Sequence, residues 1–210
     1  MSQIIACETK EGIVLGVDAK AVDMDPQGNV THSTVEWLHP LGKRAAVAAG
    51  GAPEGAEMAR LLSRFVAEEK LEDIAEIYPA ALSFLASQFQ DFRRRMCRVV
   101  PLDPMHQVYF LLAGVSALDP ENPYKLYLVW TKKKQPQLDG EEIRHAFTVP
   151  RRMALEYRLS QMAQRGSSVQ DVFKEVRAAM DSLTWYKEEV GPPYRFAVLS
   201  MDGFQELPAP

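Results

Sequence analysis

The feature of this sequence that most restricts its fold is a change of hydrophobic period that occurs twice along the chain. Runs of β-branched and aromatic residues, typical of strands, come in groups, and two segments with helical spacing follow each of the first two groups. The order is four strands, two helices, three strands, two helices and two strands. Strands grouped between helix pairs favour two sheets packed face to face, with a helix pair outside each. We therefore predict an α+β fold, a four-layer αββα sandwich of two antiparallel sheets, in a single domain that spans residues 1–210.

Turn and capping residues set the bounds of these elements. Gly12 suits a tight hairpin, Gly166 stands where a helix end favours glycine, and Ser168 begins a capping-box-like SVQD. We interpret Pro79 as the first residue of the longer helix and residues 132–140 as a polar loop. The expected strands are residues 2–9, 12–18, 34–39, 43–51, 107–116, 124–131, 143–149, 194–201 and 204–207, and the expected helices are about 53–66, 71–98, 151–165 and 168–185.

Composition argues against several classes of protein. The 210 residues carry a net charge of −4 and are 47% hydrophobic, which suits one sizeable core. No run approaches the ~18 apolar residues of a membrane helix, and the N-terminus lacks the pattern of a secretory signal. Cys7 and Cys97 are too few for a disulfide framework or zinc site, so we expect a cytoplasmic protein, with Cys7 packed in a strand. Net acidity argues against a nucleic-acid partner, and no spacing predicts a metal or cofactor.

Three stretches occur in the same order as in one known family. SQIIACETKEGIVLGVDAKAV has a small hydroxyl residue near its start and an acidic residue followed by a basic one near its end. RAAVAAGGAPEGAEMARLL is a small-residue strand followed by glycines and a helix start. SSVQDVFKEVRAAMDSLTW and YRFAVLSMDGFQEL are a long helix and a closing hairpin. Together they resemble the β-type subunits of the proteasome-type N-terminal-nucleophile (Ntn) hydrolase family over nearly the whole chain.

The resemblance implies a site at the start of the chain. In this family the side-chain oxygen of the first mature residue attacks a carbonyl, and the free α-amine of that residue serves as the base. Ser2 falls at the nucleophile's position and would become the terminus once Met1 is removed, without a propeptide. Asp18 falls at the position of the family's acid. The resemblance also implies a polypeptide substrate, no cofactor, and a homo-oligomer that forms a ring or stacked rings.

Three positions depart from the family's pattern. A register without gaps puts Glu36 where the family has the lysine that lowers the nucleophile's pKa. Lys20, His32 and Lys43 are the nearest basic residues in the sequence. The family's Gly-Ser-Gly turn aligns with residues 148–151. Its loop with an Asp and a Ser aligns with residues 187–193, where Glu188 is a possible substitute for the Asp and no hydroxyl follows. Because members of a catalytic unit cooperate, losing several of them favours weak or absent activity.

The sequence leaves three functions open. The first is a self-assembling subunit with weak or absent family-type peptidase activity. The second is an active serine-type Ntn peptidase or amidohydrolase that uses Ser2. The third is an oligomeric binding scaffold without a chamber. Apolar residues on two helices suit either a subunit interface or an ordinary core. They are Phe84, Phe89, Phe92, Met153, Leu155, Tyr157, Leu159 and Met162.

Overall fold

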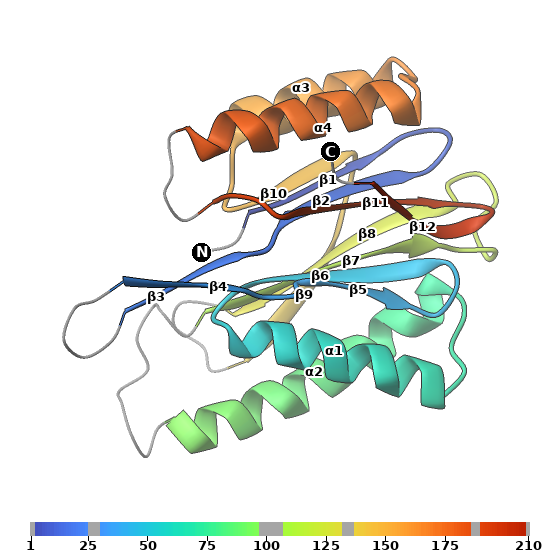
Figure 1. Cartoon of the computed structure of the whole chain (residues 1–210). Helices are drawn as coiled ribbons and strands as arrows, with labels where there is room; N and C mark the ends of the chain where they lie inside the picture. The colour runs from blue at the N-terminus through green and yellow to red at the C-terminus, as the bar shows by residue number, and fades with distance from the viewer. Residues whose placement is uncertain (1–2, 25–29, 97–106, 132–136, 186–189, 209–210) are drawn as a thin grey trace.

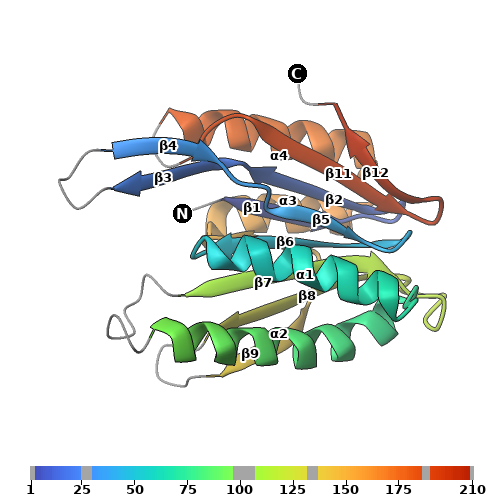
Figure 2. The ribbon, with the colours of Figure 1, turned by 60° about the horizontal axis from the view of Figure 1, so that its bottom comes forward.

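Two stacked sheets with a helix pair on each outer face form the molecule (Figure 1). The computed structural model describes residues 3–24, 30–96, 107–131, 137–185 and 190–208. One five-stranded antiparallel sheet has the strand order β10-β1-β2-β11-β12, and the other has the order β5-β6-β7-β8-β9. Helices α1 and α2 cover the second sheet, and α3 and α4 cover the first (Figures 1 and 2). The predicted αββα sandwich is confirmed.

The elements have the following bounds. The strands are β1 (Ile4–Glu8), β2 (Ile13–Asp18), β3 (Lys20–Met24), β4 (Val30–Thr34), β5 (Leu38–Leu41), β6 (Ala45–Gly51), β7 (Val108–Val115), β8 (Tyr124–Thr131), β9 (Leu138–Ile143), β10 (Ala146–Val149), β11 (Tyr194–Ser200) and β12 (Gly203–Leu207). The helices are α1 (Glu54–Glu68), α2 (Ile74–Met96), α3 (Met153–Gln164) and α4 (Val169–Thr184). Ser168 caps α4 by accepting a hydrogen bond from the Asp171 backbone, and Gly166 has the positive φ expected after a helix, so both capping predictions are confirmed.

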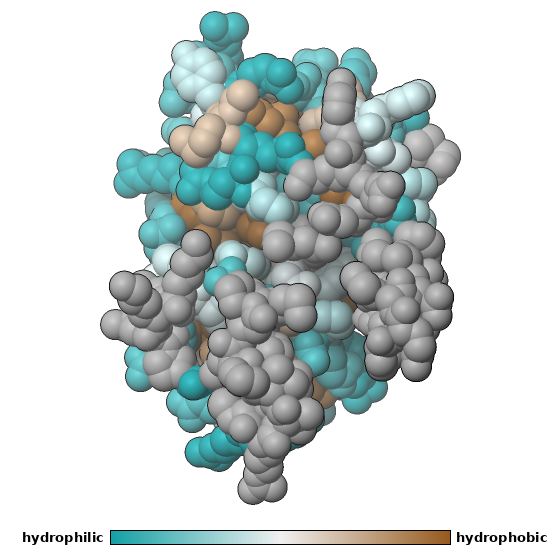
Figure 3. Space-filling view, turned by 90° about the vertical axis from the view of Figure 1, so that its left-hand side faces the viewer, coloured by the Kyte–Doolittle hydropathy of each residue, from teal (hydrophilic) through white to brown (hydrophobic). Residues whose placement is uncertain are grey.

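Chain segments far apart in sequence meet at one end of the sandwich. Strand β1 begins at this end, and β2 and β10 finish there on either side of it. Figure 3 views the molecule from this end and shows hydrophobic surface among hydrophilic side chains in its upper half, the side of α3 and α4. Asp18, which the resemblance assigns to a site, is the last residue of β2 and therefore lies at this end.

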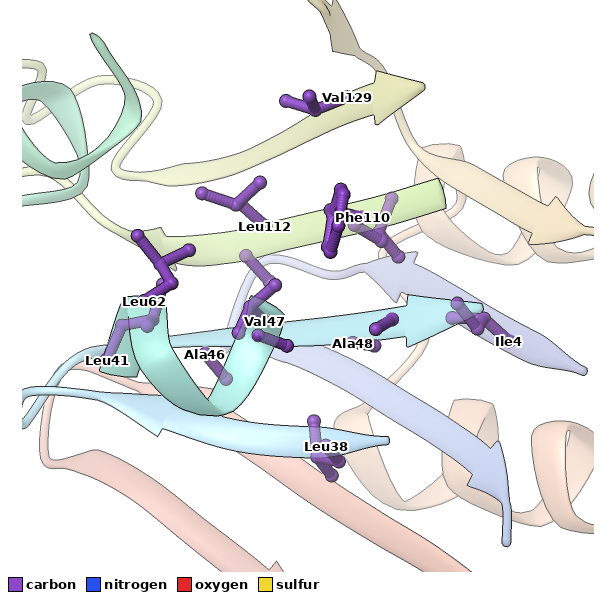
Figure 4. Packing of buried hydrophobic residues seen from close by; sticks show 14 of the residues in the cluster. Ile4, Leu38, Leu41, Ala46, Val47, Ala48, Leu62, Phe110, Leu112 and Val129 are labelled. Atoms are coloured by element: carbon purple, nitrogen blue, oxygen red, sulfur yellow. The ribbon is translucent and has the colours of Figure 1, made fainter. Parts of the chain in front are cut away.

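Small side chains let the layers approach closely around β6. Ala46 and Ala48 alternate with Val47 along this strand, and all three are fully buried (Figure 4). Their cluster joins the inner faces of the sheets to α1 and α2. At about 25 cal/mol per Å² of apolar surface, this burial is the main stabilising contribution to the fold. A second cluster lies between the first sheet and α3 and α4, and includes Val14, Leu159 and Val176.

The strand pairing differs from the prediction in two places. Residues 20–24 and 30–34 form a separate hairpin, β3–β4, between the strands expected at 12–18 and 34–39, and β5 begins only at Leu38. The single strand expected at 143–149 is two strands in different sheets, because β9 pairs with β8 whereas β10 pairs with β1. The backbone turns between them at His145, whose φ is 69°. A local strand pattern does not contain this change of sheet, since it depends on which distant strand is the partner.

Pro79 lies inside α2, so its interpretation as the first helical residue was wrong. The turn before it is held by Asp73, whose Oδ1 accepts the backbone N–H of Ala75 at 2.8 Å. The other oxygen of Asp73 accepts the N–H of Ala117 at 2.7 Å. These bonds fix the residues around the helix start, and α2 therefore begins at Ile74, more than one turn before Pro79.

Most of the helical apolar residues lie in the core. Phe89, Phe92, Leu155 and Leu159 are buried, and Phe84 and Met162 pack against the clusters. Met153 and Tyr157 remain 69% and 67% exposed on α3. No described helix is long and apolar enough to cross a membrane.

Candidate active site

Asp18 ends β2 as a buried carboxyl group beside the start of the chain. Its side chain is 1% exposed, and Oδ1 accepts the backbone N–H of Gln3 at 2.6 Å. Ser2 lies outside the described residues, so its role stays a prediction. The bond brings Asp18 to the residue that follows Ser2 in the chain.

Burial raises the pKa of Asp18 to about 7. The backbone N–H groups of Gln3 and Gly191 oppose this increase and favour the carboxylate. Oδ2 has no hydrogen-bond partner that meets ordinary distance and angle limits among the described residues. A carboxyl with this pKa exchanges a proton near neutral pH, which is a property of general acids and bases.

Gln3 connects the start of the chain to α3. Its Nε2 donates to the carbonyl oxygens of Ile4 and Val149 at 3.1 and 3.0 Å. Its Oε1 accepts from Nε of Arg152 at 2.8 Å. The sequence reasoning missed both Gln3 and Arg152, and it offered no signal for them, because the contact joins residues 149 positions apart.

A buried carboxylate organises the segment that enters α3. Oε1 of Glu156 accepts from the backbone N–H and the hydroxyl of Thr148, at 3.1 and 2.7 Å. Arg151 donates to both oxygens of Glu156, with Nε–Oε1 at 2.8 Å and Nη2–Oε2 at 2.7 Å. Although burial opposes ionisation, the bonds from Arg151 and Thr148 leave the pKa of Glu156 below its usual value. The hydroxyl of Thr148 in turn accepts the N–H of Arg152 at 2.7 Å, so the network continues to the residue that holds Gln3.

Comparison with known proteins found similarity to solved structures. No family model and no curated protein matches the sequence. A solved structure, Anbu (ancestral beta-subunit) from Yersinia bercovieri, is similar with a TM-score of 0.69 and 16% sequence identity, over 97% of this chain and 86% of that one. This chain has the proteasome β-type Ntn-hydrolase fold. At 16% identity the similarity establishes the fold, and the resemblance seen in the sequence is confirmed at that level.

The position expected for the proteasome-type lysine carries a surface carboxylate. Glu36 pairs with Arg195, which also binds Glu206 across the hairpin β11–β12. The Glu36 side chain is 59% exposed. Its charge is thus engaged at the surface with Arg195.

The basic residues that were considered as substitutes for the proteasome-type lysine differ in their position relative to Asp18. Lys43 lies in the turn between β5 and β6, and its carbonyl accepts the N–H of Phe204. It is therefore at the other end of β11 from Tyr194, the partner of Asp18 in the sheet. The side chain of His32 is not among those that the structure describes.

Lys20 is the substitute that remains close to Asp18. A Cβ atom at Gly191 would stand 3.2 Å from Cδ of Lys20, so the lysine stem passes directly over this glycine. Gly191 in turn is one of the backbone groups that favour the Asp18 carboxylate. In the proteasome-type loop aligned with residues 187–193, Glu188 lies outside the described residues, and Pro193 accepts the N–H of Ala19 at 2.9 Å.

Cys7 is a core residue, as its strand pattern predicted. It is fully buried, and burial raises the pKa of its thiol to about 12. Because the thiolate is the nucleophilic form, this pKa excludes Cys7 as a nucleophile at neutral pH.

Proposed function

We propose that the chain is a proteasome-β-like, self-assembling cytoplasmic subunit whose family-type peptidase activity is weak or absent. The environment of Asp18 carries the proposal. This carboxyl is buried, is held by the N–H of Gln3, and has a pKa raised to about 7. A lysine ammonium that dominated the environment of this carboxyl would favour the carboxylate and lower that pKa. The two largest opposing contributions come instead from backbone amides.

The departures at the other positions support the same proposal. Glu36 replaces a cation by an anion that is engaged with Arg195. The hydroxyl in the segment aligned with the Gly-Ser-Gly turn belongs to Thr148, and it donates to Glu156. Loss of one member of a cooperating catalytic unit commonly costs several orders of magnitude in rate.

The test measures the mature terminus and the turnover together. The intact mass of the protein purified from its native cells shows whether Met1 is retained. Hydrolysis of fluorogenic peptide and acyl-amide substrates is then compared between the wild type and Ser2→Ala. We expect equal, background-level rates. A chain without Met1 whose activity disappears in Ser2→Ala would refute the proposal.

The alternative is an active serine-type Ntn peptidase or amidohydrolase, and one observation favours it. The stem of Lys20 lies against Gly191, beside Asp18, so its ammonium is a candidate for the missing cation. In this alternative Ser2 attacks the substrate, its free α-amine accepts the proton, and Lys20 acts with Asp18. Lys20→Met would then lower turnover as strongly as Ser2→Ala, whereas Lys43→Met, at the other end of the sheet, would not.

Assembly into a homo-oligomer, as a ring or stacked rings, is the second part of the proposal. Met153 and Tyr157 are exposed on α3, and Trp185, just after α4, is 87% exposed. Exposed apolar side chains grouped on one helix layer are typical of interaction surfaces. Size-exclusion chromatography with light scattering on the wild type and a Met153→Lys, Tyr157→Lys double variant tests it. We expect a large assembly that the double variant disrupts.

A monomer or a dimer would exclude a closed degradative ring. A small oligomer without hydrolysis would instead favour the binding scaffold.

A further inference from the structure

A cavity of about 460 Å³ opens between the two sheets, on the side where β10 forms the edge of the first sheet. One wall comes from β10 and the residues after it, and the other from β7, β8 and β9. Its volume is within the range of sites that hold small ligands or single side chains of a partner. Its lining includes residues 148–151, the segment aligned with the Gly-Ser-Gly turn, whereas Asp18 is not among the described lining residues.

The second-sheet wall is aromatic because of strand register. Tyr109 on β7 is directly opposite Trp130 on β8, and both line the cavity. Leu128, two residues earlier on the same strand face, lies opposite Glu141 on β9. The hydroxyl of Tyr109 donates to Oε1 of Gln107 at 2.8 Å, so its ring is held in place. The result is a partly open aromatic and aliphatic slot with a carboxylate along one side.

Two charged residues are among the described residues that line the cavity, and they differ in their partners. Arg151 lines it too, but its guanidinium binds both oxygens of Glu156 and lies 4.5 Å from the centre of the Phe147 ring. That positive charge is therefore compensated within the protein. The side chain of Glu141 makes no hydrogen bond or ion pair within the described part of the chain.

The adjacent Glu142 provides a contrast to Glu141. Successive residues of a strand point to opposite faces of the sheet. Glu142 lies on the other face from the cavity and binds Lys125 at 3.6 Å. Of the charged side chains that the structure describes in the slot, the carboxylate of Glu141 is therefore the one available to a ligand.

We propose that this cavity binds the side chain of an arginine or lysine residue in a polypeptide partner or substrate. The flat faces of Trp130 and Tyr109 contact the stem and the cation, and Glu141 neutralises the charge. An aromatic face next to a carboxylate favours a basic side chain over an acidic or a purely aliphatic one of the same length. The proposal requires no reaction at Ser2 and is independent of whether the chain is a peptidase.

The test is equilibrium binding of N-acetylarginine amide and its uncharged isostere, N-acetylcitrulline amide. Binding is followed by the shift of the Trp130 indole N–H resonance, assigned with Trp130→Phe, and by calorimetry. The Ser2→Ala protein is used so that hydrolysis contributes nothing. A ligand of this size is expected to bind with a Kd on the order of 1 mM. We expect the arginine compound to bind about tenfold more tightly than the citrulline compound, since the charge-assisted bond to Glu141 is lost.

Two carboxylate variants separate the cavity from general surface charge. Glu141→Gln should weaken arginine binding about tenfold and remove the preference over citrulline. Glu142→Gln, a neighbouring change on the opposite face of β9, should leave both unchanged. Equal affinity for the two ligands, equal effects of the two variants, or no perturbation of Trp130 would each overturn the proposal. Because the readout is binding, these failures are distinct from absence of peptidase activity.

Discussion

The backbone N–H of Gln3 donates to Oδ1 of Asp18 over 2.6 Å, and the carboxyl that accepts it is almost fully buried. The start of the chain is thereby tied to the end of β2. From the side chain of Gln3, the connection continues to Arg152, and from the backbone of Arg152 through Thr148 to Glu156. Three segments distant in sequence, at residues 3, 18 and 148–156, are thus linked at the start of the chain, and each link can be tested by itself.

The first prediction concerns the pH dependence of stability. The pKa of Asp18 is raised from its ordinary value of 3.8 to about 7 in the folded chain, so the folded state holds the proton more tightly. This contribution to stability is fully present below about pH 4 and is lost as pH rises through 7. The amide side chain introduced by Asp18→Asn does not titrate. The free energy of unfolding of this variant, relative to that of the wild type, should therefore increase by up to about 4 kcal/mol as pH rises from about 4 to above 7. Urea unfolding at pH 4, 5.5, 7 and 8 measures it.

The control for this prediction is Asp181→Asn, which changes an exposed carboxylate on α4. Its difference from the wild type should stay constant over the same range. A constant difference for Asp18→Asn as well would show that the Asp18 carboxyl is not perturbed.

The second prediction concerns the anchor of the N-terminal strand. Arg152→Met removes the donor to Gln3 and should cost about 1 kcal/mol. Amide hydrogen exchange in β1 should become faster, because its first residues lose a link to α3. Arg158→Met is the matched control, since Arg158 lies on α3, the helix that begins directly after Arg152, and binds Glu175 at the surface. Equal exchange in β1 for the two variants would contradict the proposed anchoring.

The third prediction concerns the buried carboxylate of α3. Glu156→Gln leaves the donors of Thr148 and Arg151 facing an amide, and should lower the free energy of unfolding by about 3 kcal/mol at pH 7. Since the pKa of Glu156 is lowered in the folded chain, its contribution exists above pH 4.5 and decreases as pH falls through the folded pKa. Glu175→Gln, which breaks the surface pair, should cost less than 1 kcal/mol, roughly. Urea titrations at pH 7 and pH 3 compare them; the loss at Glu156 should be smaller at pH 3.

The fourth prediction uses two glycines. A Cβ at Gly114 on β7 would stand 2.7 Å from Cβ of Ile74 and 2.9 Å from Cβ of Ala45, so Gly114→Ala should destabilise the fold by about 1–3 kcal/mol. A Cβ at Gly55 in α1 would meet its nearest atom at 3.5 Å, an ordinary contact. Gly55→Ala should therefore be neutral or stabilise by up to about 1 kcal/mol, because alanine restricts the unfolded chain. Thermal unfolding of both variants tests the pair, and the same sign for both would refute the packing argument.

Much of the fold was predictable because its signals are local. The helical spacing of apolar residues in α4 and the cap at Ser168 lie within one stretch of chain, as does the hairpin at Gly12. In that hairpin, the Thr9 hydroxyl accepts the N–H of Gly12. The hairpin β3–β4 and the change of sheet at His145 were missed, because a strand's partner is not encoded in its own alternation.

The candidate site likewise has features that the sequence predicted and features that only the tertiary structure decided. Sequence by itself determined the sandwich and the position of Asp18 at the end of a strand, since these depend on residue order and local patterns. Tertiary structure decided that Asp18 is buried against Gln3, that Arg152 holds Gln3 from 149 positions away, and that Glu141 lies beside Trp130 in a cavity. The physical reason is that pKa values, hydrogen bonds and cavities depend on which atoms displace water around a group, and those atoms come from segments that only folding brings together.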